Sequence, residues 1–316
     1  MNSANSAADR IERIGIYIGL IALVVAPFVV YPVFVMKVLC FGLFAAAFNL
    51  LIGYGGLLSF GHAAFFGTGG YLAAHAAKVW GLDPLVCVLF ATLGAAFTGV
   101  LIGALAIRRK GIYFSMITLA LSQMVFFIAL QAPFTGGEDG VQGVPRGFLF
   151  GIFDLNKPLI MYAFVSAIFL GGMFMINRVV KSPFGQILMA IRDNEPRAIS
   201  LGYDVDRYKL TAFIISAALA GLAGGVKSLV FQLASLTDIT WQMSGEVVLI
   251  TLLGGIGTLL GPVVGAIIVI SLENYLATID FPVPVLIGAI FVVCVLLFRR
   301  GIVGELRHWA SRRAGG

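Results

Sequence analysis

The chain has 316 residues, of which 60% are hydrophobic and only 11% are charged, and its mean hydropathy is +1.01. So few charged side chains cannot cover the surface of a water-soluble globule of this size. The apolar residues also come in runs of about 20, the length that crosses a hydrocarbon core of about 30 Å. These features exclude a soluble enzyme, a disordered chain and a small disulfide-linked scaffold. They predict an all-α, polytopic transmembrane helical bundle.

The net charge of +6 is distributed unevenly along the chain. Basic residues concentrate in four segments, 1–14, 107–111, 178–209 and 299–316, whereas the remainder is net acidic. Lys and Arg collect on the cytoplasmic side of membrane proteins. The pattern therefore predicts that both termini are cytoplasmic. It assigns the basic residues to membrane orientation and predicts no nucleic-acid partner.

The apolar runs predict about ten spans. The stretch 246–279 would be about 51 Å long as one helix, too long for one crossing, and glycines and Pro262 interrupt its middle. Two short crossings there also bring the four basic segments to one side of the membrane. The expected spans are 15–36, 38–53, 62–79, 85–107, 111–131, 158–178, 209–230, 246–260, 262–279 and 284–299.

Two glycine-rich stretches, 53–70 and 246–265, interrupt this pattern, one in each half of the chain. Paired interruptions are typical of the binding or translocation zone of a transporter, where broken or re-entrant helices occur. The alternative is that these glycines only allow close helix packing. Between the halves, residues 132–157 are rich in turn-forming residues and predict a compact external loop.

The segment 179–208 predicts a short helix, a break and a second short helix. Ser182 is placed to cap a helix that starts at Pro183, and an apolar stripe follows. Pro196 ends that helix and starts another, for which Gly202 is a suitable terminator. Such an amphipathic element can lie on the membrane surface or dock in the groove of a soluble partner.

At these residues the chain resembles a known family. SPFGQILMAIRDNEPRAISLGYDVDRYKLTAFIISAALAGLAG (182–224) and GYGGLLSFGHAAFFGTGGYLAA (53–74) are similar to signature segments of the branched-chain amino acid ABC importer permeases. RRKGIYFSMITLALSQM (108–124), TGGEDGVQG (135–143) and LLGGIGTLLGPVVGA (252–266) resemble the LivM-type subunit more than its LivH-type partner. One departure is Arg197, where many members carry a small or acidic residue, which concerns the exact partner contact.

The resemblance implies a single permease domain over 1–316, in a bacterial inner (plasma) membrane, with 179–208 as its cytoplasmic coupling loop. It implies four kinds of partner: a second, LivH-like permease, two ATP-binding subunits, a periplasmic solute-binding protein and the membrane itself. No GxxxxGK[ST] motif is present, so ATP and Mg²⁺ are expected on the partner ATPases and no cofactor in this chain. Related permeases also carry urea, short amides and other small carboxylates, so the resemblance fixes the family better than the cargo.

The resemblance also implies which residues of the loop act in coupling. Ile191 is expected to fill a groove of the ATPase, Arg192 and Glu195 to set the register, and the glycines to allow close approach and helix termination. The expected coupling residues are Gly185, Ile191, Arg192, Asn194, Glu195 and Gly202.

Small and neutral polar side chains in the spans are expected to line the substrate pathway. His62, in the glycine-rich break, suits hydrogen bonding to cargo or, as we favour, to neighbouring backbone. The expected pathway residues are Asn49, Ser59, His62, Thr118, Ser122 and Gln123.

Two other classes of protein are weighed against an importer subunit. An ion-coupled secondary carrier usually keeps acids or histidines within its spans. Here Glu246, Lys227 and Glu273 fall near expected span ends and Lys37 beside an external loop, which favours ATP-driven transport. A membrane-embedded enzyme would need clustered acids or histidines, and the sequence shows no such motif.

Overall fold

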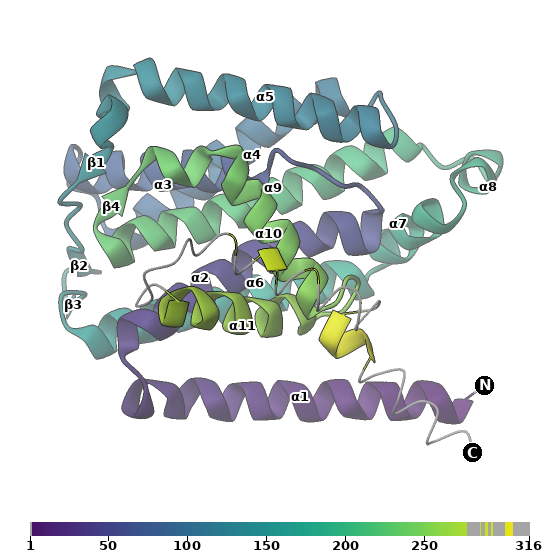
Figure 1. Cartoon of the computed structure of the whole chain (residues 1–316), viewed down its shortest axis with the longest axis horizontal. Helices are drawn as coiled ribbons and strands as arrows, with labels where there is room; N and C mark the ends of the chain where they lie inside the picture. Colours follow the sequence, from purple (N-terminus) through teal and green to yellow (C-terminus); the bar gives the residue numbers. More distant parts are fainter. Residues whose placement is uncertain (1, 277–284, 286–287, 290–291, 293–300, 306–316) are drawn as a thin grey trace.

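The computed structural model describes residues 2–276, 285, 288–289, 292 and 301–305, and within the first helix the side chains of residue 15 and of residues from 17 onward. The helices lie side by side and run alternately in opposite directions (Figure 1). Four two-residue strands lie at one end of this bundle and two short helices at the other. We call these the strand end and the α7 end.

The helices are α1 (Asn2–Val29), α2 (Pro32–Asn49), α3 (His62–Lys78), α4 (Pro84–Ala106), α5 (Ile112–Gln131), α6 (Pro158–Lys181), α7 (Pro183–Asp193), α8 (Glu195–Ser200), α9 (Val205–Phe231), α10 (Trp241–Gly254) and α11 (Gly261–Leu276). Short helical turns are η1 (Leu50–Tyr54, a π-helix), η2 (Pro133–Thr135), η3 (Gly137–Asp139) and η4 (Leu236–Ile239). The strands are β1 (Val141–Gln142), β2 (Phe148–Leu149), β3 (Phe153–Asp154) and β4 (Leu233–Ala234).

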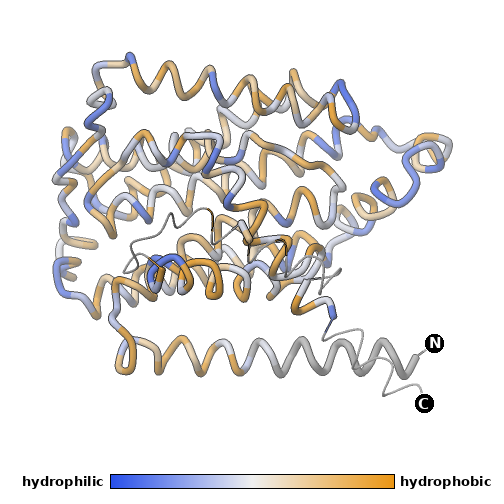
Figure 2. The backbone as a smooth tube through the Cα atoms, in the orientation of Figure 1, coloured by the Kyte–Doolittle hydropathy of each residue, from blue (hydrophilic) through white to orange (hydrophobic). Residues whose placement is uncertain are grey.

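Five helices are long and apolar enough to cross a membrane, and the apolar segments Tyr17–Val29 and Gly261–Leu276 are shorter. Hydrophobic residues follow the helices, and hydrophilic residues gather at the two ends of the bundle (Figure 2). This arrangement confirms the all-α membrane bundle. The expected span 284–299 lies outside the described residues apart from four isolated positions. The five long segments are Pro32–Tyr54, Pro84–Ala106, Ile112–Gln131, Pro158–Lys181 and Val205–Phe231.

Proline places the start of several helices, because its missing N–H would have no partner in the first turn. Pro32, Pro84, Pro158 and Pro183 each begin a helix in this way. The first of them corrects one expectation. The connection between the first two helices precedes Pro32, so Lys37 lies within α2 and not in a loop.

Helix α9 lies in the centre, against α2, α3 and α4. Glycines bring its backbone directly onto its neighbours: a Cβ on Gly224 would overlap the carbonyl of Phe66, and one on Gly69 would overlap Gly221. Helices in a membrane associate through such small residues because burial from lipid supplies little driving force. The glycines of 67–70 therefore serve packing, as the alternative interpretation proposed.

Both predicted interruptions occur, each narrower than the stretch expected. After α2 and η1 the chain is mostly non-helical from 56 to 61, before α3 begins. Residues 255–260 turn α10 back onto α11, and Gly254 and Gly265 permit backbone contact between these two helices. The described part of this stretch, 246–276, is thus two antiparallel helices, as expected. We call 55–61 the first break and 255–260 the second break.

Residues 132–157 form a compact segment at the strand end, as predicted; their position outside the membrane stays a prediction. Within it β2 pairs with β3, and β1 pairs antiparallel with β4 from beyond α9, joining Val141 to Ala234. The loops 132–157 and 232–240 are therefore one structural unit.

Candidate functional site

The helix–break–helix prediction for the α7–α8 segment is confirmed. Ser182 Oγ accepts a hydrogen bond from the Gly185 N–H at 3.3 Å, and Asn194 Oδ1 accepts one from the Arg197 N–H at 3.1 Å. These caps satisfy N–H groups that have no partner within their helices. Gly202, with a φ of 85°, ends α8. Helix α8 begins one residue earlier than expected, at Glu195.

Two of the expected coupling roles need correction. Ile191 is only 2% exposed and packs with Ala198 and Val205, so it holds α7 against α8 and α9 and cannot fill a partner's groove in this conformation. Gly185 is buried where a Cβ would meet the carbonyl oxygens of Val179 and Val180. Both residues shape the segment internally, and its exposed side chains are left to meet a partner.

Arg192 connects α7 to the first break. Its Nη1 donates a hydrogen bond to the carbonyl oxygen of Gly53 at 2.5 Å, and its aliphatic stem lies against Gly56, where a Cβ would be 2.7 Å from Cγ. Leu188, one turn earlier on α7, lies beside Gly55. A displacement of α7 would therefore act directly on the end of η1 and the start of the first break.

Asn49 joins the two breaks. It is 2% exposed, its Nδ2 donates to the Thr258 carbonyl at 2.8 Å, and its Oδ1 accepts from the Gly257 N–H at 2.9 Å. Gly53 lies against the Gly257 backbone, which a Cβ would approach to 2.6 Å. Arg192, Gly53, Asn49 and Gly257 thus form a continuous chain of contacts from α7 to both breaks.

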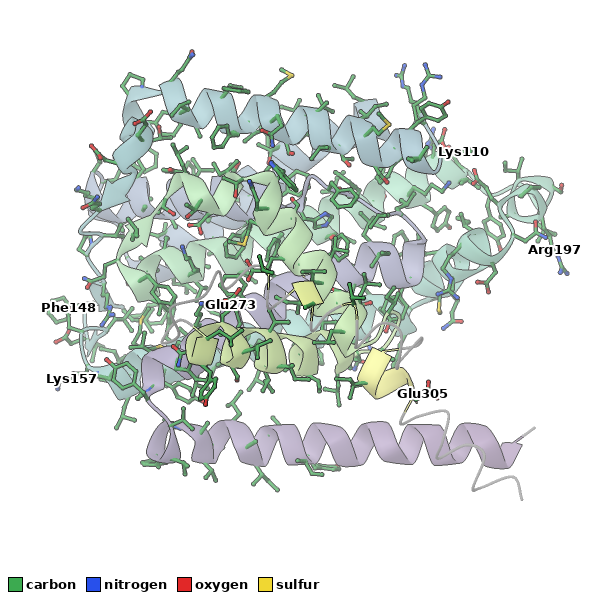
Figure 3. The ribbon with its side chains drawn as sticks, viewed as in Figure 1. Lys110, Phe148, Lys157, Arg197, Glu273 and Glu305 are labelled. Carbon is green, nitrogen blue, oxygen red and sulfur yellow. The ribbon has the colours of Figure 1, made fainter. Side chains whose placement is uncertain are left out.

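Glu195 ties α8 to two other segments at the α7 end. Its carboxylate pairs with Lys110 at 2.8 Å and with the buried Lys209 at 2.9 Å. Burial alone would raise the pKa of Glu195, but hydrogen bonds from the two ammonium groups outweigh burial and hold this pKa below its usual value. Lys110 lies at the start of α5, and Arg197 points away from the bundle at the tip of the segment (Figure 3).

Two of the expected pathway residues bind backbone N–H groups of the first break. Ser59 does so from within the break, and Thr118 does so from α5. Thr118 Oγ1 accepts from the Phe60 N–H at 3.2 Å, and Ser59 Oγ accepts from the Gly61 N–H at 3.2 Å. Ser115, which the sequence analysis did not select, donates to the Leu58 carbonyl at 2.6 Å. These side chains are enclosed in this conformation and bind backbone.

Within the described residues, Ser122 and Gln123 form no side-chain hydrogen bond to another helix. The Ser122 hydroxyl donates to Leu119 of its own helix at 2.7 Å. The buried Gln123 Nε2 has no hydrogen-bond partner within the described residues. Both residues lie further along α5 than Ser115 and Thr118, the two residues that bind the first break.

His62 begins α3 and is fully buried. Its Nε2 lies 2.8 Å from Ser216 Oγ, and the Ser216 hydroxyl donates to the Ala47 carbonyl. Since the single hydroxyl proton goes to Ala47, Nε2–H is the donor to Ser216. Aromatic rings of Phe48, Phe65 and Phe213 surround the imidazole edge-on. The favoured expectation is a bond to neighbouring backbone. His62 instead binds the side chain of Ser216 on α9, so its contact is structural but its partner is not the expected one.

The sequence analysis missed Gly53, Gly257, Lys110 and Lys209 as members of this network. Glycine-rich composition did indicate the two breaks, and a lysine at the start of an apolar helix is a signal for Lys209. Their pairing with Asn49, Arg192 and Glu195 has no local signature, because the partners are far apart in sequence.

The fold and this network define a class: a multi-pass membrane protein whose interrupted helices are linked to an amphipathic segment at one end. Residues 33–298 match the family described as branched-chain amino acid transport system / permease component. The chain belongs to this family of ABC importer permeases, as the resemblance implied. It is accordingly a transporter subunit and not an enzyme; in this family, separate ATPase subunits bind ATP.

Relatives of known name agree with this assignment. The chain is 28% identical over 290 residues to the high-affinity branched-chain amino acid transport system permease protein LivM of Escherichia coli, covering 84% of this chain and 68% of that one. It is 25% identical to a probable LivM of Methanocaldococcus jannaschii, over 81% and 85% of the two chains. The ribose import permease protein RbsC of Bacillus subtilis is 26% identical over 92% and 93%. No solved structure matches the chain.

Proposed function

We propose that this chain is the LivM-like permease of a heteromeric ABC importer for branched-chain amino acids. It would work with a LivH-like permease, two ATPases and a periplasmic solute-binding protein, in a bacterial inner membrane. We place the α7 end and the start of α1 in the cytoplasm because the basic segments 107–111 and 178–209 lie at that end together with the start of α1 (Figure 1). The basic composition of 299–316 supports the same side for the carboxyl terminus.

The observation that carries the mechanism is the Arg192 contact to Gly53. The exposed side of the α7–α8 segment would dock on an ATPase, and closure of the ATPases would move α7 as a unit. Arg192 and Leu188 would pass that movement to the first break, and Asn49 would pass it to the second. Two packed arrangements of these contacts would give closed and open paths, as bistable elements do in switching proteins.

The inward path would open beside the first break. Its hydrogen bonds to Ser115 and Thr118 of α5 are the contacts that must separate there. Asn49, Ser59, His62, Thr118, Ser122 and Gln123 remain the proposed lining once α5 moves away. Uptake by single alanine variants tests this set, and unchanged uptake in all six would reject it.

The transport assay uses the complete complex in liposomes with ATP inside and the loaded binding protein outside. We expect ATP-dependent uptake of leucine, isoleucine or valine and none of ribose. Ribose uptake without leucine uptake would place the chain with its sugar-transporting relatives. Uptake by this chain alone along an ion gradient would instead support a secondary carrier.

The coupling assay uses Ile191→Pro, which breaks α7 outside the main core, with Ile191→Val as the matched control. Proline removes a helical N–H and distorts the preceding turn. We expect the proline variant to assemble but to lose stimulation of ATP hydrolysis by the loaded binding protein. The valine variant keeps it. Full stimulation in Ile191→Pro would refute the coupling assignment.

A further inference from the structure

A second group of ionisable side chains lies away from the α7 network, between the helices toward the strand end. It comprises Lys37 of α2, Tyr71 of α3, Lys227 of α9, Asp238 of η4, Glu246 of α10 and Glu273 of α11. We call these six residues the inter-helix cluster. Ionisable groups at membrane depth are costly and usually functional, so each of them needs a partner or a purpose.

Two ion pairs account for four members of this cluster. Lys37 Nζ lies 3.3 Å from Glu273 Oε2, and Lys227 Nζ lies 2.8 and 2.6 Å from the two oxygens of Asp238. Cys40, one turn after Lys37 on α2, is within electrostatic reach of Lys227. The two pairs are therefore neighbours, and Glu273 from α11 faces the bundle (Figure 3).

Glu246 is the carboxyl group of the cluster that lies outside both ion pairs. None of the ion pairs among the described residues includes it, and the charged groups that act on it are Glu273, Lys37, which is already paired with Glu273, and Asp238. Three carboxyl groups thus share two ammonium groups, so a further ammonium group could pair with Glu246 in place of a proton.

Tyr71 supplies an independent indication of a ligand. Its side chain is 2% exposed, yet its hydroxyl has no hydrogen-bond partner within the described residues. Gly67 lies one turn earlier on the same face of α3, against the backbone of Asp238, so this face is directed at η4. Asp238 is also the charged group that acts on both Tyr71 and Glu246. A buried hydroxyl without a partner costs free energy that a ligand would recover.

We propose that the inter-helix cluster binds the charged end of a free α-amino acid, with Glu246 accepting from its ammonium group and Tyr71 donating to its carboxylate. The ammonium group would pair with Glu246, and the Tyr71 hydroxyl is the unused donor of the cluster. The site lies inward of the joined loops 132–157 and 232–240, where cargo would arrive. A sugar has no ammonium group and would leave Glu246 unmatched. This inference rests on the proposed function and specifies the permease's own recognition of cargo.

The test is binding of radiolabelled L-leucine to the complete permease–ATPase complex in nanodiscs, without the binding protein. Two competitors separate the ends of the amino acid: isoamylamine keeps only the ammonium group, and 4-methylpentanoate keeps only the carboxylate. We expect wild-type complex to bind leucine, isoamylamine to compete and 4-methylpentanoate to compete at least tenfold less well. No leucine binding, or equal competition by 4-methylpentanoate, would overturn the proposal.

Variants assign the effect to residues. Glu246→Gln keeps the shape and should lower leucine affinity at least tenfold, whereas Glu138→Gln, an exposed acid of η3, should leave the affinity unchanged. Tyr71→Phe should lower leucine affinity about threefold or more. If Glu246→Gln fails to assemble, the affinity of Tyr71→Phe alone tests the site. Wild-type affinity in Tyr71→Phe and in an assembled Glu246→Gln variant would overturn the site.

The proposed function is judged separately, by uptake through the wild-type complex. If the wild-type complex takes up leucine and both variants bind leucine with wild-type affinity, the proposed binding site is refuted but the importer function is supported. Absence of branched-chain amino acid uptake in wild type would instead remove the proposed function.

Discussion

The α7 end and the inter-helix cluster use charged residues in different ways. At the α7 end each carboxylate or guanidinium of the network has partners: Glu195 has two lysines, and Arg192 has Asp193 and the backbone of Gly53. In the inter-helix cluster Glu246 belongs to none of the ion pairs among the described residues, and the nearby Lys37 is paired with Glu273. A fully paired network transmits displacement between the segments it joins. A network that contains an unpaired carboxyl group can still bind a cationic group of a ligand.

The largest expected effect breaks a completed pair in the inter-helix cluster. Lys227→Met leaves Asp238, which is 4% exposed, as a buried carboxylate without its ammonium partner. We expect the free energy of unfolding to fall by about 3–5 kcal/mol. Thermal or denaturant unfolding of the purified complex measures this change.

The matched control for that prediction removes the unpaired carboxylate instead. Glu246→Gln should change stability by less than about 1 kcal/mol, because no ion pair is lost. The double variant Lys227→Met, Asp238→Asn should recover part of the loss. Equal destabilisation by Lys227→Met and Glu246→Gln would contradict the prediction that the paired groups stabilise the fold more than the unpaired carboxyl group does.

The next effect concerns the join between the two breaks. Asn49→Leu removes two hydrogen bonds and leaves the Gly257 N–H and Thr258 carbonyl unsatisfied. We expect a loss of about 2–4 kcal/mol in stability and of most uptake. Thr98→Val, which loses only a bond within α4, serves as control and should stay within about 0.5 kcal/mol with normal uptake. Similar losses in both variants would argue against a special role for Asn49.

A change at Arg192 separates transmission from folding. Arg192→Met keeps an aliphatic stem against Gly56 but loses the hydrogen bond to Gly53. We expect cargo-stimulated ATP hydrolysis to fall about tenfold, equivalent to about 1.4 kcal/mol of coupling, with assembly retained. Arg178→Met, at an exposed arginine of α6, should keep normal stimulation. Normal stimulation in Arg192→Met would show that α7 does not act through the first break.

The smallest effect is a pH dependence at Glu195. Its pKa is lowered in the folded protein, so its contribution to stability is complete above the unfolded value of about 4.5 and is lost as pH falls through the folded pKa. We expect Glu195→Gln to cost about 1 kcal/mol at pH 7 through the buried Lys209, and less below pH 4. Parallel unfolding curves of wild type and variant across pH 3–7 would contradict this. Asp193→Asn, at an exposed acid, is the control.

Much of the fold was predictable because membrane helices follow local rules. Span length, proline at helix starts and glycine at interruptions each depend on a few neighbouring residues, as in 246–279 and in the α7–α8 segment. Lys37 shows where local reasoning failed: an isolated lysine between apolar runs suggests a loop, but its partner Glu273 is 236 residues away. Ile191 failed for a similar reason, since an apolar stripe does not say which surface covers it.

The sequence by itself determined an all-helical membrane protein, the family to which it belongs, and the caps and break of α7 and α8. Those features follow from hydropathy and from hydrogen-bonding groups within a few residues. Only the tertiary structure decided that Asn49 joins the two breaks, that Arg192 reaches Gly53 and that Glu246 lies outside the ion pairs of the described residues. Each of these depends on which distant helix faces lie together, and close backbone packing at residues such as Gly224 and Gly257 sets that arrangement.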